Sequence, residues 1–179
     1  MNFSLRLALP LVLAGSLALV GCGEATSTED PAVEQVGGTN ARHTATIQRR
    51  IAANNAKDWS TWESLHTPGA VRTAPELPQP LVGAKAMRAG IEELVVTFPD
   101  YHLELVQAFG DGDRLVARIH TKGTMLGPMD IGGANKIPPT GKVFEQDWVA
   151  VITFDGDLIA SIDEFHDNYG ILIQLGLTQ

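Results

Sequence analysis

The spacing of apolar residues changes abruptly at Pro99, and no other feature of the sequence constrains the fold as strongly. From Ala84 to Phe98, apolar residues recur every three or four positions, the pattern of an amphipathic helix. Pro99 ends that helix because proline has no amide hydrogen to donate. From Tyr101 onwards polar and apolar residues alternate, which predicts strands covered on one face. Helices followed by an antiparallel meander predict an α+β fold, a curved sheet packed on helices.

The other segments are assigned on the same basis. Residues 41–66 have a helical pattern with a break at Asn54 and Asn55, after which Asp58 can cap a second short helix. The proline-rich stretch from Thr67 to Pro80 is predicted to be a loop. Beyond Pro99 we expect strands Tyr101–Phe109, Leu115–Thr124, Val143–Phe154 and Leu158–Asp167, turns at Gly110–Asp113 and Asp155–Asp157, a loop at Leu126–Gly141 and a helix at Tyr169–Leu175.

The N-terminal segment predicts export. The apolar run from Leu7 to Val20 is shorter than the roughly 20 residues that a membrane-spanning helix needs. It ends in Gly21-Cys22, with the only cysteine of the chain, and resembles the lipobox of bacterial lipoproteins. In those proteins the thiol is acylated and the chain is cut just before it. An ordinary cleaved signal peptide is the alternative.

This interpretation divides the chain into three parts. We expect a signal peptide over residues 1–21, a flexible tether over residues 22–39 and one domain over residues 40–179. The protein would be exported and anchored by lipid on Cys22 to a bacterial membrane, in the periplasm or at the cell surface. The formal net charge of −8 makes a nucleic-acid partner a poor expectation. Metal-site spacings, a phosphate-binding glycine loop and a serine nucleophile elbow are absent from the sequence.

Several short segments follow one another in a recognisable order along the predicted domain. They are Pro75-Glu76-Leu77, Pro80–Gly83, Phe98-Pro99-Asp100, Gly112–Arg118, Gly123-Thr124, Pro139–Lys142, Asp155-Gly156, Asp167–Gly170 and Gln174-Leu175-Gly176. Their order and spacing resemble the SnoaL-like polyketide cyclases, often called ester cyclases. Two positions depart from the family pattern: Met125 stands where many members have histidine, and Ile162 or Asp163 where many have tryptophan. The stretch from Gly156 to Asp167 is one residue longer, which suggests a β-bulge.

The resemblance implies a nuclear-transport-factor-2-like fold, a cone of curved antiparallel sheet wrapped on N-terminal helices around a pocket. It also implies a cofactor-free ring closure of the aldol type, in which the aspartate of the D-x-x-G segment is the general acid/base. That aspartate matches Asp167. A base of this kind needs an apolar surrounding that raises its pKa, and Phe165 and Tyr169 are neighbours that could supply one. The structural alternative is that Asp167 caps the last helix.

Other candidate site residues lie on the central strands. Alternation places Arg118 and His120 on one strand face, and either is a candidate polar partner for Asp167. Trp148 and Asp147 on the next strand could line the same pocket, as could Trp62 on a helix. His166 is expected on the opposite face from Asp167 as a surface or dimer-contact residue, and His66 and His102 as surface residues.

Two functions fit these observations. The first is cofactor-free acid/base chemistry, a ring closure or related isomerisation, on a small apolar carbonyl compound. The alternative is a lipid-anchored protein that binds a small hydrophobic molecule without transforming it. In either case the resemblance implies a homodimer, with the sheet as a candidate contact surface. Fold alone does not decide between the two.

Overall fold

The computed structural model describes residues 38–130 and 136–178, all of which belong to one unit, Val33–Gln179. The predicted signal peptide, Cys22 and most of the tether lie outside the described residues and stay predictions. Within the described segments, no helix is long and apolar enough to cross a membrane. The first helix begins at Gly38, two residues before the expected start of the domain.

The described residues form four helices, and the sequence predicts all of them. Helix α1 spans Gly38–Ala56 and α2 spans Trp59–Ser64, so the break falls just after the expected asparagine pair. The Asp58 side chain accepts a hydrogen bond from the Thr61 amide and caps α2 as predicted. Helix α3 spans Ala84–Thr97 and α4 spans Asn168–Leu175.

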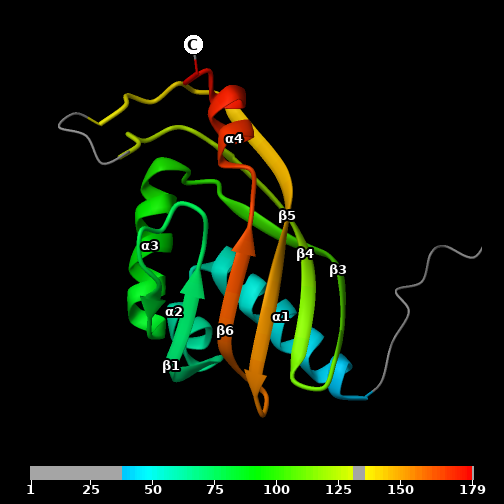
Figure 1. Ribbon diagram of the computed structural model, residues 1–179. Coiled ribbons are helices and arrows are strands. Elements are labelled where there is room, and N and C mark those ends of the chain that lie inside the picture. The colour runs from blue at the N-terminus through cyan, green and yellow to red at the C-terminus, as the bar shows by residue number, and fades with distance from the viewer. Residues whose placement is uncertain (1–37, 131–135, 179) are drawn as a thin grey trace, which may run out of the picture. The chain divides into compact units, whose positions relative to one another are not determined.

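One six-stranded sheet has the order β2-β1-β6-β5-β4-β3. The strands are β1 (His66–Thr73), β2 (Leu81–Val82), β3 (His102–Asp111), β4 (Arg114–Thr124), β5 (Val143–Asp155) and β6 (Leu158–Phe165). Strands β3 to β6 form the expected antiparallel meander. Figure 1 shows α1 crossing the sheet, with α2 and α3 beside β1.

The first two strands correct the predicted loop over Thr67–Pro80. Strand β1 pairs with β6 in parallel, so the sheet is not wholly antiparallel, and its register shifts between His66 and Val71. Pro68 and Gly69 occupy this irregular part, which hides the strand from a search for alternation. The predicted extra residue before Asp167 is also visible, because the β5–β6 register shifts beside Ala160.

The core lies between α1 and one face of the sheet, which we call the inner face. Apolar side chains from α1 and strands β3 to β6 fill it: Ile47, Ile51, Leu103, Ala108, Leu115, Ala117, Ile119, Trp148, Ala150, Ile152, Phe154, Ile159 and Ile162. The other face, the outer face, carries exposed side chains on every second residue of the long strands. Any charged group on the inner face is therefore removed from bulk water and needs a partner.

Candidate functional site

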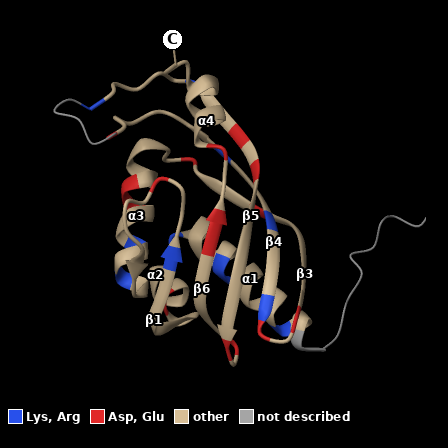
Figure 2. Cartoon of the chain, in the orientation of Figure 1, with Lys and Arg blue, Asp and Glu red and all other residues tan. Residues whose placement is uncertain are grey.

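Five charged or titratable side chains interrupt the inner face at one place. Arg50 comes from α1, His66 and Arg72 come from β1, Glu164 comes from β6, and His166 directly follows β6. Arg50, His66 and Glu164 are almost fully buried. Figure 2 shows the basic position on β1 beside the acidic one on β6. We call these five residues the inner cluster.

An ion pair joins the two strands. The Arg72 Nη2 atom donates to Glu164 Oε2 at 2.6 Å and to Glu76 Oε1 at 3.0 Å. The side chains of Arg72 and Glu164 are 15% and 6% exposed, so this pair is screened far less than a surface pair. Burial opposes the charge on Arg72, but the hydrogen bonds and charge of Glu164 outweigh burial and raise the Arg72 pKa.

Arg50 lies deeper and has a different set of contacts. Its Nε donates to His66 Nε2 at 3.3 Å, and its guanidinium lies over the Trp62 ring, 5.0 Å from the centroid. The other ring nitrogen of His66 lies 2.9 Å from the Trp62 carbonyl oxygen. Because that carbonyl can only accept, His66 carries its proton on Nδ1 and accepts through Nε2. Burial is the main reason that the Arg50 pKa falls to about 10.

His166 is held between an aromatic ring and two carboxylates. Its ring centroid is 5.6 Å from that of Trp148. The Nε2 atom lies 3.3 Å from Glu76 Oε2 and 3.6 Å from Glu164 Oε2, yet it is a buried atom with no hydrogen bond of good geometry. The side chain is 14% exposed, so the expected surface position of His166 is wrong, while the alternative of a dimer contact stays a prediction. Because Asp167 faces outward and neighbouring side chains alternate in direction, His166 points inward.

Tyr101 adds a phenol to this region. It packs against the apolar core and interacts electrostatically with Arg50, Arg72 and Glu164. Burial raises the pKa of Tyr101 to about 12, and a hydrogen bond with Thr121 only partly offsets that rise. The phenol therefore keeps its proton at neutral pH and is available as a hydrogen-bond donor.

The carboxylates in and beside the inner cluster are poor candidates for a metal site. Glu76, Glu164 and His166 can place one ligand atom each within 4.8 Å of one another. However, the Arg72 guanidinium already binds both glutamates. A cation placed there would have to displace Arg72 and would meet its charge, so the cluster is better explained as an ion-pair network.

Asp167 occupies a different environment from the one expected. Its side chain is exposed, and Oδ1 accepts a hydrogen bond from the Gly170 amide at 2.8 Å, which caps α4. A Cβ atom at position 170 would collide with the Asp167 carboxylate. Capping therefore explains both fixed residues of the D-x-x-G segment. The apolar surrounding predicted for Asp167 is not present within the described chain, and its catalytic role stays a prediction.

We expect Asp167→Ala to lower the free energy of unfolding by about 1 kcal/mol, because the first turn of α4 loses its cap. Asp167→Asn should change it by a few tenths, since asparagine caps equally well. Urea titrations of both variants measure this. Equal losses in the two variants would show that the charge, and not the cap, is what matters.

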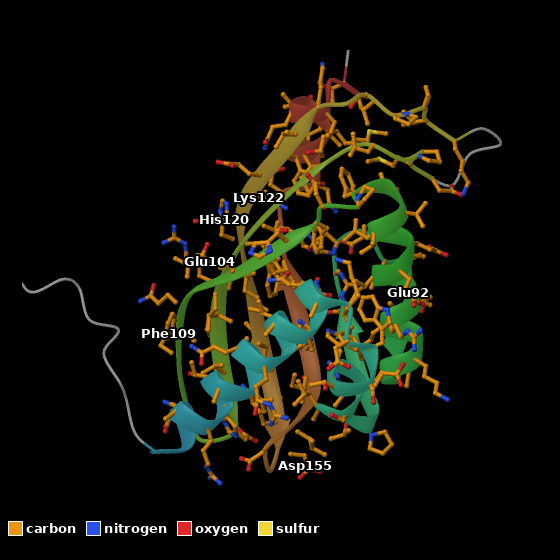
Figure 3. All side chains as sticks on the ribbon, turned by 180° about the vertical axis from the view of Figure 1, so that it is seen from behind. Glu92, Glu104, Phe109, His120, Lys122 and Asp155 are labelled. Atoms are coloured by element: carbon orange, nitrogen blue, oxygen red, sulfur yellow. The ribbon has the colours of Figure 1, made fainter. Side chains whose placement is uncertain are left out.

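The other predicted pocket residues divide between the two faces. Arg118 and His120 both bind Asp147, with Arg118 Nε 2.9 Å from Oδ2 and His120 Nδ1 2.8 Å from Oδ1. This triad lies on the outer face, and Figure 3 shows His120 directed away from α3. Asp167 is exposed as well, and the expected approach of Arg118 or His120 to it stays a prediction. Trp148 and Trp62, by contrast, lie on the inner side beside His166 and His66.

Sequence reasoning missed most of the inner cluster, although weak signals exist. Arg50 lies one helical turn after the buried Ile47, on the apolar side of α1. Glu164 shares its strand face with the buried Ile162. His66 was expected on the surface and is 5% exposed. In each case a polar residue at a core position marks the site.

His66 should make stability depend on pH. Burial, followed by the charge of Arg50, lowers the His66 pKa to about 4 from an ordinary value of 6.5. The unfolded chain therefore binds this proton first, and stability is lost as the pH falls from about 6.5 to 4, by up to about 3 kcal/mol. Urea titrations across this range measure the effect. His66→Gln should flatten the curve in this window, and an unchanged slope would contradict the assignment.

Comparison with known proteins assigns the chain to a family. The model of the SnoaL-like polyketide cyclase family matches residues 45–175, and the chain belongs to this family. No curated protein matches at a significant level. The predicted family is thereby confirmed for the domain.

Solved structures confirm the predicted fold. A SnoaL-like candidate cyclase from Jannaschia sp. CCS1 is 18% identical with a TM-score of 0.70, over 82% of this chain and 99% of that one. TsrD from Streptomyces laurentii is 25% identical with a TM-score of 0.67, over 79% and 100%. A protein from Catenulispora acidiphila with a ketosteroid isomerase-like fold is 14% identical with a TM-score of 0.61, over 74% and 93%. The architecture is thus nuclear-transport-factor-2-like.

Proposed function

We propose that this protein catalyses cofactor-free proton transfer at a carbon next to the carbonyl group of a small apolar compound, as in a ring closure or a related isomerisation. The observation that carries this proposal is the inner cluster, which places two histidines, a carboxylate and two guanidinium groups in an otherwise apolar core, with Glu76 at its edge. Proton abstraction beside a carbonyl needs a base, a donor for the enolate oxygen and exclusion of water.

His166 is the base in this proposal. Its Nε2 faces Glu76 and Glu164, so the favoured tautomer carries a proton on that atom, and Nδ1 is left to accept one from the substrate. The two carboxylates then stabilise the imidazolium that forms, and they hold the ring in place together with Trp148. Arg72 keeps the carboxylates fixed and takes no part in the transfer itself.

Tyr101 is the donor for the enolate oxygen. Its raised pKa keeps the phenol protonated, and the aromatic ring packs against the core. A neutral donor in a site of low dielectric constant stabilises developing negative charge more than the same donor would in water. Tyr101 directly precedes β3 and His166 directly follows β6, and in this proposal the substrate is held between them.

One observation favours the alternative, a binding protein that does not transform its ligand. The position that matches the family's acid/base aspartate is Asp167, and its carboxylate is exposed and engaged in capping. If Asp167 is the only base that the family chemistry can use, this chain binds without reacting. The lipid anchor proposed at Cys22 is compatible with either function.

Deuterium exchange at the α-carbon of propiophenone, followed by proton NMR in D2O, tests the proposal. This neutral ketone has one kind of α-proton and no other acidic group, so exchange reports base catalysis directly. The protein should accelerate exchange well beyond free imidazole at the same concentration. Binding of the ketone without acceleration would favour the alternative function, and neither binding nor acceleration would argue against both.

A further inference from the structure

We propose that the natural ligand carries a carboxylate group, and that this group binds the two terminal nitrogens of Arg50. The inference rests on the proposed function only for the location of the site. It adds the chemical class of the ligand, a small apolar or aromatic carboxylic acid. Three features of Arg50 carry it: its free donors, the charge balance around it and the groups that surround it.

Arg50 is buried, and the two terminal nitrogens of its guanidinium make no hydrogen bond within the described chain. The whole residue is 5% exposed, and its one hydrogen bond within the described chain is from Nε to His66. The two terminal nitrogens have no partner among the residues described. They are not fully buried atoms, whereas Trp62 Nε1 is. A planar pair of parallel donors matches the two oxygens of a carboxylate.

The inner cluster contains more buried positive charge than buried negative charge, so an additional anion would balance it. Arg50 is buried there and Arg72 is mostly buried, while among the described residues of the cluster the one buried carboxylate is that of Glu164. Glu164 bonds to Arg72, and Glu76 is 40% exposed at the edge of the cluster. A buried cation without a bonded anion is costly, and a ligand carboxylate would remove that cost.

The neighbours of Arg50 suit a neutral ligand body with one negative end. His66 is neutral at pH 7, because burial lowers its pKa, so it adds no competing charge. The guanidinium lies over the Trp62 ring. Trp148 and Tyr101 supply apolar and aromatic surface on the same side of the sheet. A planar acid of modest size therefore fits this composition better than a polyanion does.

The exposed arginine of the outer face offers a contrast. Arg118 is 52% exposed and already binds Asp147 through two nitrogens. Its charge is already balanced by Asp147 and solvated by water, so it does not need a further anion. Arg118→Gln is therefore a matched control for Arg50→Gln, because each variant removes one guanidinium from the domain.

Calorimetric titration with 3-phenylpropionate and with its amide, 3-phenylpropionamide, at pH 7 tests the inference. The two probes have the same shape and differ in charge, and neither has the ketone needed for exchange. We expect the wild-type protein to bind the acid about 10–100-fold more tightly than the amide, the scale of a charge-assisted pair. Arg50→Gln should abolish this preference, Arg50→Lys should retain part of it, and Arg118→Gln should leave it unchanged.

Equal affinity for acid and amide in the wild-type protein, or no binding of the acid at millimolar concentration, overturns the inference. That comparison needs no variant, so it decides even if Arg50→Gln does not fold. A preference that persists in folded Arg50→Gln would place the carboxylate elsewhere and also overturn it. Failure of ketone exchange leaves this result untouched, so the ligand class and the proposed chemistry can fail separately.

Discussion

Glu164→Gln should lower the free energy of unfolding by about 3–5 kcal/mol, the scale found when one partner of a buried ion pair is removed. The Glu164 side chain is 6% exposed, and its carboxylate bonds to Arg72 and interacts electrostatically with the buried Arg50. Glutamine keeps the shape and one acceptor oxygen, but it leaves Arg72 and Arg50 to repel one another in the core. Urea or thermal unfolding followed by circular dichroism measures the loss.

A matched control distinguishes the loss of a buried carboxylate from the loss of an exposed one. Glu92→Gln removes a carboxylate that accepts from Arg88 on the surface of α3, where the Glu92 side chain is 44% exposed. That variant should lose far less stability, because surface pairs contribute little. A loss below about 1 kcal/mol in Glu164→Gln would mean that the inner cluster is solvated, and the argument from buried charge would fail.

His166→Gln should reduce catalysed exchange of propiophenone by about 10²–10⁴-fold, the usual contribution of a general base. Glutamine can still pack against Trp148 but cannot take up a proton, so folding and ligand affinity should change little. NMR exchange rates, with affinity measured separately, distinguish loss of a base from loss of binding.

Asp167→Asn is the control that sets this account against the family expectation. Asparagine retains the cap of α4 and removes the carboxylate. Exchange should continue at the wild-type rate if His166 is the base. If Asp167→Asn loses activity while His166→Gln keeps it, the family's aspartate acts here as well, and the inner cluster has a structural or binding role.

Much of the fold can be predicted from local patterns. Helix α3 and the meander from β3 to β6 follow directly from periods of 3.6 and 2, and their turns from glycine and aspartate. Asp58 is recognisable as a cap from its position alone. Strand β1 is not, because its pairing with β6 is parallel and distant in sequence, and Pro68 and Gly69 interrupt its alternation.

The candidate site is harder to predict because it is assembled by tertiary contacts. Arg72 and Glu164 are 92 positions apart in the chain, and only the β1–β6 pairing brings them together. Alternation assigns residues to two strand faces but does not say which face is inner. That ambiguity placed Arg118 and His120 in the expected pocket, and it left Glu164 and His166 out of it.

A crystal structure of the protein with 4-oxo-4-phenylbutanoate tests the central claim, that the inner cluster is the ligand site, most directly. This molecule combines a ketone with a carboxylate. The account predicts its carboxylate on the terminal nitrogens of Arg50 and its keto group near His166 and Tyr101. Density for the ligand beside Arg118 and His120 on the outer face, or against Asp167 with the inner cluster unchanged, would contradict it.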